Sequence, residues 1–394
     1  MKTENKAAHE PLFHVVKRDN LKIWTKIGIY AAAIIGGLFL CGIICAIAGD
    51  GNPFLVFGSL IVGAFDSGDN VLYFLRTAFL LIGVSMALLP AFKMKFWNLG
   101  ANGQILIGGL ATIMCMHFMG GKVPDGVIIL CMIVSSILAG AIWAVIPAIC
   151  KAYFNTNESL FTLMMNYIAQ GLVAAFVAYC VTDSSGTIKN LTLPEQVYGN
   201  LPELGNEYTL TILVCALIFG LMFIYTRYSK KGYETAVVGD SQHTSKYIGI
   251  NVKKVIIRTL IISGAICGIV GLLLTGNYPH SINEGTAENM GFTAIMTTWL
   301  ADCNPLFIIA ACCFVAFITN GMEQVCEDFG FLNDSVSNLI IGIIYFFIIA
   351  CAFFIKYKVL FRKKSNGTKK SDNASTDNAP AERVADAIAA KEAK

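Results

Sequence analysis

Residues 92–110, FKMKFWNLGANGQILIGGL, form the stretch that decides the fold of this chain. They lie between two apolar runs, 72–91 and 105–118, so they join two membrane helices and begin the second. That second helix opens with amides and glycines, which are Asn98, Gly100, Asn102, Gly103 and Gln104. Amides at a helix start cap free backbone groups or face a polar solute, and glycines let another backbone approach. The stretch therefore predicts either a capped, tightly packed membrane helix or a helix that lines a path through the membrane.

The composition places the chain among the polytopic helical membrane proteins. Of its 394 residues 56% are hydrophobic and only 14% are charged, whereas about a quarter of the residues in a soluble domain are charged. Long apolar runs recur, and the short alternating strands of a β-barrel do not appear. We therefore predict an all-α fold with about ten membrane segments. Most of the 13 cysteines lie inside apolar runs, and no Cys/His spacing predicts a metal site.

The apolar runs divide the chain into a membrane domain, 27–355, and two tails. The tails are 1–26 and 356–394, of which the second is predicted to be disordered. Full spans are predicted at 27–48, 72–91, 99–119, 127–149, 155–181, 208–227, 255–275, 306–319 and 339–355. Pro147 is expected to end its span, and 321–337 is expected to be a polar loop. The apolar middle of 51–70 is too short to span comfortably, which predicts an interfacial or re-entrant segment.

Residues 290–300 form an apolar run only about half a membrane thick. Discontinuous helices of this kind often form solute sites near the membrane midplane. Thr297, Thr298 and Trp299 offer hydroxyl and aromatic groups there, which suit a ring or a sugar, although helix packing accounts for each residue equally well. The sequence leaves open whether this segment crosses the membrane or re-enters.

Basic residues gather on one side of the predicted topology. If the N-terminus is cytoplasmic, the inner loops hold ten basic residues and the outer loops hold only Lys122 and Lys189. The ten are Lys93, Lys95, Lys151, Arg227, Lys230, Lys231, Lys246, Lys253, Lys254 and Arg258. This bias predicts that both termini are cytoplasmic. It also requires an even number of crossings, which is ten if 290–300 counts as one.

Two polar clusters lie on the predicted inner side. The loop 228–254 is punctuated by Gly232, Gly239 and Gly249, and its pattern predicts short helices at 234–238 and 241–248, with Asp240 or Ser241 as a cap. In the second cluster Glu158, Thr162 and Asn166 are four residues apart, so they share one helix face. Helix capping and a solvated loop explain these patterns without any further function.

Four stretches resemble the permease subunits of bacterial ABC importers for simple sugars and nucleosides. WNLGANGQ at 97–104 is similar to the family's FNIGAEGQ, with Asn102 in place of the acidic residue, and NESLFTLMMNY at 157–167 is similar to NEVISTIMLNY. The loop 232–252 resembles GxExRAVGxNxxAAxYxGINV, with Thr235 in place of the arginine. It matches at Gly232, Glu234, Ala236, Val237, Gly239, Tyr247, Gly249, Ile250, Asn251 and Val252. Residues 290–305 keep part of GYGFDGIAVALLGxxxP.

The resemblance implies a multi-pass permease of the bacterial plasma membrane that works by alternating access. It implies a partner ABC ATPase that uses the ATP, a second homologous permease and an external solute-binding lipoprotein. The solute would be a nucleoside or, as the second choice, a simple sugar. No cofactor and no nucleic acid is expected on this chain, whose remaining contacts are with membrane lipid. Implied ATPase-coupling residues are Gly232, Glu234, Ala236, Gly239, Tyr247 and Gly249, and implied solute-path residues are Asn98, Asn102, Gln104, Asn166, Thr297, Thr298 and Trp299.

Two other classes of protein fit the sequence less well. An ion-coupled secondary transporter calls for ionisable residues in mid-span, whereas Arg76 and Glu323 are expected near the membrane faces. A membrane-embedded enzyme calls for paired catalytic groups, and the chain has no P-loop, HExxH or Ser/His/Asp pattern. We therefore predict that the chain is not itself an enzyme.

Overall fold

The computed structural model describes residues 13–17, 35–40, 42–44, 53–180, 191–192, 198–202, 204–277, 280–330 and 357–361, with scattered positions in 25–32 and 342–350. Most of the predicted spans at 27–48 and 339–355, and most of the loop after 181, lie outside these ranges. The chain divides into a unit of residues 21–355, which holds the helices, and a unit formed by the two ends, 1–20 and 356–394.

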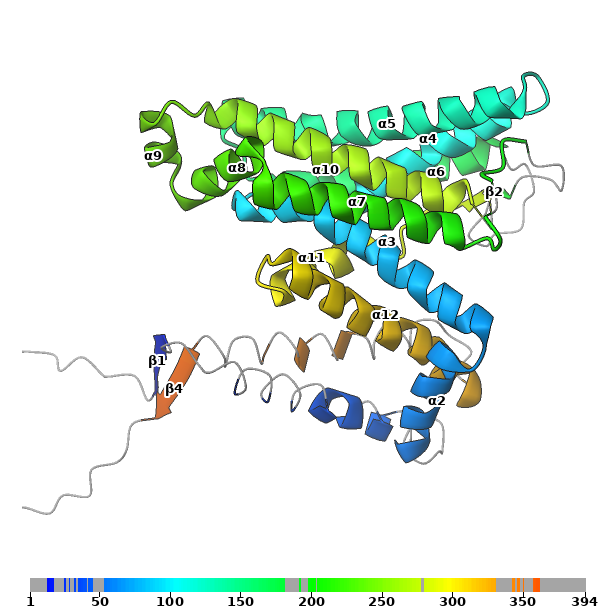
Figure 1. The fold of residues 1–394 in the computed structure, drawn as a ribbon, viewed down its shortest axis with the longest axis horizontal. Helices are drawn as coiled ribbons and strands as arrows, with labels where there is room; N and C mark the ends of the chain where they lie inside the picture. Colours follow the sequence, from blue (N-terminus) through cyan, green and yellow to red (C-terminus); the bar gives the residue numbers. More distant parts are fainter. Residues whose placement is uncertain are drawn as a thin grey trace, which may run out of the picture. The chain divides into compact units, whose positions relative to one another are not determined.

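Seven helices in the described residues are long and apolar enough to cross a membrane, which confirms the all-α prediction. They are α3 (Gly68–Lys93), α4 (Ala101–Met119), α5 (Asp125–Phe154), α6 (Glu158–Cys180), α7 (Thr209–Tyr228), α10 (Val252–Thr275) and α12 (Pro305–Asp328). Four shorter helices accompany them: α2 (Pro53–Phe65), α8 (Lys230–Asp240), α9 (Gln242–Tyr247) and α11 (Met290–Leu300). In Figure 1 α4, α5, α6, α7 and α10 run alongside one another, and α8 and α9 lie at one end of them.

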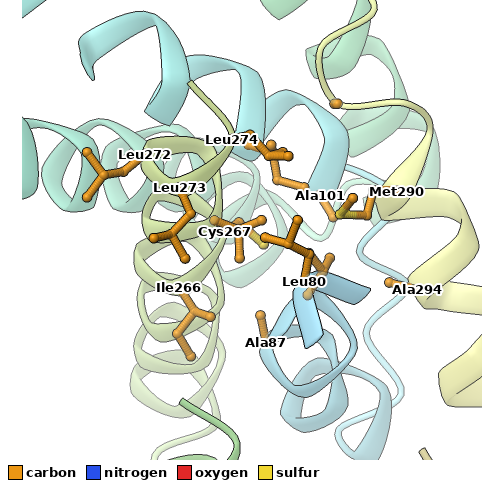
Figure 2. Close-up of a cluster of buried hydrophobic side chains, with 14 of the residues drawn as sticks. Leu80, Ala87, Ala101, Ile266, Cys267, Leu272, Leu273, Leu274, Met290 and Ala294 are labelled. Atoms are coloured by element: carbon orange, nitrogen blue, oxygen red, sulfur yellow. The ribbon is translucent and has the colours of Figure 1, made fainter. Parts of the chain in front are cut away.

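Helix α10 is packed backbone to backbone against α4 and α5. A Cβ atom on Gly268 would lie 2.2 Å from the Ser136 carbonyl oxygen, and one on Gly271 would lie 2.2 Å from the Ile105 carbonyl oxygen. Only glycine leaves room for such close approach. The buried cluster next to this contact joins α10 to α3 and α11, and Figure 2 shows it with Leu80, Ala87, Cys267, Leu273 and Met290.

Two helices extend beyond their predicted ends. Helix α5 continues past Pro147 to Phe154, so the expectation that Pro147 ends this helix is wrong. Proline removes one hydrogen bond, but a packed helix tolerates that loss in a membrane. Helix α12 runs to Asp328 rather than stopping at 319. The added residues of α12 pack on α2. A Cβ atom on Gly321 would lie 2.7 Å from the Leu60 carbonyl oxygen, which shows how close the two helices are.

The described residues of 276–300 pass from one end of the helix bundle to the other, and α11 forms only the last part of that passage. Near its start, the Asn277 amide donates to Thr211 Oγ1 (3.3 Å), at the beginning of α7. At its end, the Trp299 ring lies 5.4 Å from that of Trp97, just beyond the end of α3. The last residues of α7 and of α3 both lie beside α8. The Asn277 contact is at the start of α7 and the Trp299 contact follows the end of α3, so the two contacts lie at opposite ends of the bundle. The segment therefore crosses the bundle rather than re-entering.

The two ends of the chain form a small antiparallel ladder. Strand β1 (Phe13–Lys17) pairs with β4 (Tyr357–Phe361), with Phe13 opposite Phe361 and Lys17 opposite Tyr357. The prediction of disorder from residue 356 onward does not hold for these five residues, since both strands are rich in aromatic and β-branched residues. A second pair joins β2 (Leu191–Thr192) to β3 (Ser281–Ile282).

Replacement of Gly268 by alanine should destabilise the protein by about 1–3 kcal/mol, because the added Cβ would meet the α5 backbone. The matched control is Gly171→Ala in α6, where nothing lies within 4 Å of a Cβ atom and alanine favours the helix. Thermal unfolding of the purified proteins in detergent measures both effects. Equal melting temperatures for Gly268→Ala and the parent would show that the α5–α10 contact has been misjudged.

Candidate functional site

The start of α4 is held by amide side chains, two of which lie outside the helix itself. Asn98 is fully buried, and its Oδ1 accepts hydrogen bonds from the Gly100 N–H (3.1 Å) and from Gln104 Nε2 (3.4 Å). Asn166 of α6 reaches across to accept from the Gly103 N–H (2.8 Å) and to donate to the Leu99 carbonyl (2.8 Å). These contacts satisfy backbone groups that a helix start leaves free. Asn98 and Asn166 therefore hold the backbone at the start of α4, where the N-cap is Gly100, and their contact with a solute stays a prediction.

The connection before α11 and α11 itself form one broken span. Asn102 and the threonines of α11 join this broken span to α4 and α3. Asn102 Oδ1 accepts from the Gly291 N–H (2.6 Å), and a Cβ atom on Gly291 would lie 2.6 Å from the Asn102 backbone nitrogen. Thr297 Oγ1 lies 2.8 Å from Ser85 Oγ of α3, and Thr298 donates to the Ala294 carbonyl at 2.7 Å. All three of these predicted path residues are buried, at 3% exposure or less. They brace α11, and their contact with a solute stays a prediction.

Aromatic side chains supply the exposed part of the predicted site. Trp299 is 55% exposed and Trp97 is 38% exposed, with their rings 5.4 Å apart. Phe92 packs edge-on against Trp97 at 5.7 Å. Trp97 was absent from the predicted path residues, although it opens the motif at 97–104. The pair presents apolar rings next to the amide network.

Two buried polar atoms near this network have no hydrogen-bond partner within the described part of the chain, Gln104 Oε1 and Trp143 Nε1. A Cβ atom on Gly103 would lie 3.1 Å from Trp143 Nε1, so the indole N–H lies beside the start of α4. Buried polar atoms without partners are rare in native proteins. Gln104 Oε1 therefore remains available as an acceptor and Trp143 Nε1 as a donor. Each could bind a water molecule, or a group that approaches in another conformation of the protein.

Helix α8 is fixed rigidly to the ends of α3 and α7. A Cβ atom on Gly239 would lie 1.9 Å from the Lys93 carbonyl oxygen, and one on Gly232 would lie 2.3 Å from the Tyr225 carbonyl oxygen. Val238 is buried in a cluster with Met94, Val255 and neighbouring residues. Close packing therefore requires two of the three glycines in the predicted coupling set, Gly232 and Gly239.

Helix α8 begins earlier than predicted. Its cap is Ser229, whose Oγ accepts from the Gly232 N–H at 2.9 Å, so the helix covers Lys230–Asp240 rather than 234–238. The predicted cap Ser241 is confirmed for α9, where its Oγ accepts from the Thr244 N–H at 3.2 Å. A serine three residues before a glycine gave no clear helix signal in the sequence, because the packing of the helix on α3 decides its length.

An ion pair ties α8 to α10. Arg258 Nη2 lies 2.9 Å from Glu234 Oε2 and also donates to the Lys231 carbonyl at 3.3 Å. Arg258 was not among the predicted coupling residues, since 24 positions separate it from Glu234. Thr235, next to Glu234, is buried and donates to the Lys231 carbonyl, and Ala236 is half-buried.

Helix α9 projects from this base. Tyr247 is 92% exposed and Ile248 is 58% exposed, and Figure 1 places α9 at the extreme end of the helices. Gly249 adopts φ +83° and turns the chain back toward α10, which explains why glycine stands there. A cleft of about 430 Å³, lined in part by Glu234, Gly249 and Arg258, opens beside the turn. An exposed tip on a rigid base suits contact with a partner protein.

The chain is similar in sequence to known permease proteins. A family described as "Branched-chain amino acid transport system / permease component" matches residues 70–350. The chain is 28% identical over 295 residues to the guanosine ABC transporter permease protein NupP of Bacillus subtilis, which covers 74% of this chain and 83% of that protein. It is 25% identical to the nucleoside ABC transporter permease protein NupB of Lactococcus lactis (86% and 95% covered). Identity to the glucose ABC transporter permease protein TsgB13 of Haloferax volcanii is 23% (87% and 92% covered).

Asn102→Leu should destabilise the protein by about 1–3 kcal/mol, because it leaves the buried Gly291 N–H without an acceptor. Trp299→Ala should lower the melting temperature much less, since more than half of that side chain is exposed. Thermal unfolding of both variants in detergent compares them directly. If Asn102→Leu unfolds at the parental temperature, the bond to Gly291 does not hold α11 in place.

Proposed function

The chain belongs to the family of branched-chain amino acid transport system permease components, and we propose on this basis that it is the membrane subunit of an ATP-driven nucleoside importer. The family match over residues 70–350 is the observation that carries this proposal. The printed names of two relatives, a guanosine permease and a nucleoside permease, support the choice of solute. A glucose permease among the relatives keeps simple sugars as the second candidate. The chain itself is a multi-pass membrane permease and not an enzyme.

The proposed contact with the ATPase subunit is the surface of α9, with Tyr247 and Ile248 at its tip. The support is mechanical, because Gly239 seats α8 on the last carbonyl of α3 and Arg258 binds Glu234. A force applied to α9 therefore moves α3 and α10 as rigid bodies, which is how nucleotide-driven closure reaches a membrane domain. ATP would be consumed on that partner, and this chain would bind no cofactor.

The proposed route of coupling continues along α3 to the broken span. Ser85 lies eight residues before Lys93, about 12 Å along the helix, and its hydroxyl contacts Thr297 of α11. A movement of α3 would therefore carry α11, and with it Trp299 and the Asn102–Gly291 contact. The solute path would lie along this side of α11. A second homologous permease and an external solute-binding lipoprotein complete the proposed importer.

Reconstitution separates this proposal from its rivals. Guanosine uptake into proteoliposomes should require the ATPase, ATP and the binding protein, and a proton ionophore should leave it unchanged. Uptake that needs an ion gradient and no ATP would instead identify a secondary transporter. Uptake of glucose but not guanosine would favour the sugar candidate.

Tyr247→Ala should reduce recovery of the ATPase with this chain several-fold, because it removes the most exposed aromatic ring of α9. Its melting temperature in the absence of the ATPase should match the parent, since the side chain is 92% exposed. The matched control is Tyr179→Ala, a 78% exposed tyrosine near the end of α6. Co-purification measures the association. Undiminished recovery with Tyr247→Ala would remove α9 as the docking surface.

We expect both termini on the cytoplasmic side. The bias of basic residues supports this orientation, and the pairing of β1 with β4 supports the expectation that the two ends share one compartment. Single cysteines introduced at Lys364 and Asn190, compared with the parent chain, should react with an impermeant maleimide on opposite sides of the membrane. Labelling of both sites in intact cells would exclude this topology.

A further inference from the structure

Helix α7 presents one continuous apolar face that the described chain leaves uncovered. The side chains on this face are between 56% and 74% exposed and are three or four residues apart: Leu213, Leu217, Leu221, Ile224 and Tyr228. The opposite face of α7, with Cys215 and Met222, is buried in the bundle. Since α7 is long and apolar enough to cross a membrane, the exposed face suits acyl chains. Tyr228 ends this face with a polar hydroxyl, and tyrosines of this kind gather at the membrane–water interface.

Helix α5 marks the same boundary. Its exposed apolar face, which includes Ile142 and Ile146, ends at Tyr153, and that side chain is 61% exposed. Ala148 of α5 belongs to the buried cluster that contains Val238 of α8, so α5 and α7 both end beside α8. The two tyrosines at these helix ends therefore place the level of the lipid headgroups near the start of α8.

A cleft of about 520 Å³ opens at this level, between the end of α7 and the turn that follows α9. Figure 1 shows α8 and α9 at this end of α7. The cleft is lined mainly by two basic side chains, two tyrosine rings and two isoleucines, which are Arg227, Lys230, Tyr228, Tyr233, Ile248 and Ile250. Tyr228 belongs both to the cleft and to the exposed face of α7. The apolar face therefore leads directly into the cleft.

Positive charge prevails in this cleft. Arg227 and Lys230 are exposed, and among the described residues neither has an ion-pair partner. Glu234 is the acidic residue of the lining, and Arg258 already neutralises it at 2.9 Å. Lys254 adds a positive charge in the adjoining cleft beside Gly249. Basic residues next to a membrane helix attract anionic lipid headgroups. The cleft thus combines cations that suit a phosphate with an apolar approach that suits acyl chains.

We propose that this cleft binds the headgroup of an anionic phospholipid, whose acyl chains lie along the exposed face of α7. Arg227 and Lys230 bind the phosphate, and the rings of Tyr228 and Tyr233 border the glycerol region. An acidic segment of a protein partner offers the same charge but has no acyl chains for the face of α7. The headgroup also lies against Ile248, next to the tip of α9. A bound lipid therefore supports the base of α9 and does not depend on which solute is carried.

Photo-crosslinking of the unaltered chain in nanodiscs tests this site. The probe is phosphatidylglycerol with a diazirine close to the headgroup on one acyl chain, and phosphatidylcholine with the same chain is the comparison. Peptide mapping should find phosphatidylglycerol adducts in residues 221–233 several-fold more often than phosphatidylcholine adducts. Soluble glycerol phosphate should not reduce them, because it has no acyl chain. Equal labelling by the two lipids would overturn the proposal, as would phosphatidylglycerol adducts that are equally frequent around Tyr179, near the end of α6.

Removal of charge gives a second measurement. Arg227→Gln combined with Lys230→Gln should reduce labelling by phosphatidylglycerol to the level of phosphatidylcholine. The matched control is Lys95→Gln combined with Lys246→Gln, which removes two exposed charges that line neither cleft and should keep the parental preference. Both double variants should unfold at the parental temperature in a neutral detergent, since all four side chains are exposed. A preference that persists without Arg227 and Lys230, or that the control loses equally, contradicts the site.

The assembled importer examines the alternative occupants of the cleft. Phosphatidylglycerol should label residues 221–233 there as it does in the chain alone, and it should raise the melting temperature of the parent more than phosphatidylcholine does. If the labelling disappears on assembly and the same residues crosslink to the ATPase or to the second permease, a protein subunit covers the cleft and the proposal is wrong.

Discussion

The close contact of α10 with α4 and α5 is the constraint on which the rest of the molecule depends. Lipid is as apolar as leucine, so helices in a membrane gain little from burying large apolar side chains against one another. They gain from close packing. Gly268 and Gly271 have no Cβ atom, so the backbone of α10 comes into direct contact with the backbones of α5 and α4. This pairing fixes α4, and thereby the position of the amide residues at its start. The shorter helices are then arranged around a rigid centre.

Polar groups inside that frame serve as connectors between helices. Asn166 joins α6 to α4, Asn102 joins α4 to α11, and Ser85 joins α3 to α11. Hydrogen bonds of this kind are retained in a membrane because an unpaired polar group in lipid costs several kcal/mol. They are also directional, so a shift of one helix must move its partner or break the bond. The same residues that stabilise the resting structure therefore provide the proposed route of coupling from α8 to α11.

The broken span lies between two of the aromatic groups in the described part of the protein. Trp97 and Trp299 lie beyond the start of α11, on the side of α8, whereas Tyr73 and Tyr208 lie with Arg76 at the other end. Irregular backbone at such a depth is tolerated where protein or a water-filled space surrounds it.

The sequence by itself determined the helical membrane fold and the bounds of α11, because apolar runs and their lengths report directly on a lipid environment. It also located both polar clusters and, through the resemblance, the family. Tertiary structure decided the rest. Helix α12 continues past 319 because α2 covers it, and Glu234 finds Arg258 only after two helices pack together. Sequence shows only that amides lie at these positions. The contacts of Asn98 and Asn166 with the backbone at the start of α4 appear only in three dimensions, since a hydrogen-bond partner distant in the chain leaves no local pattern.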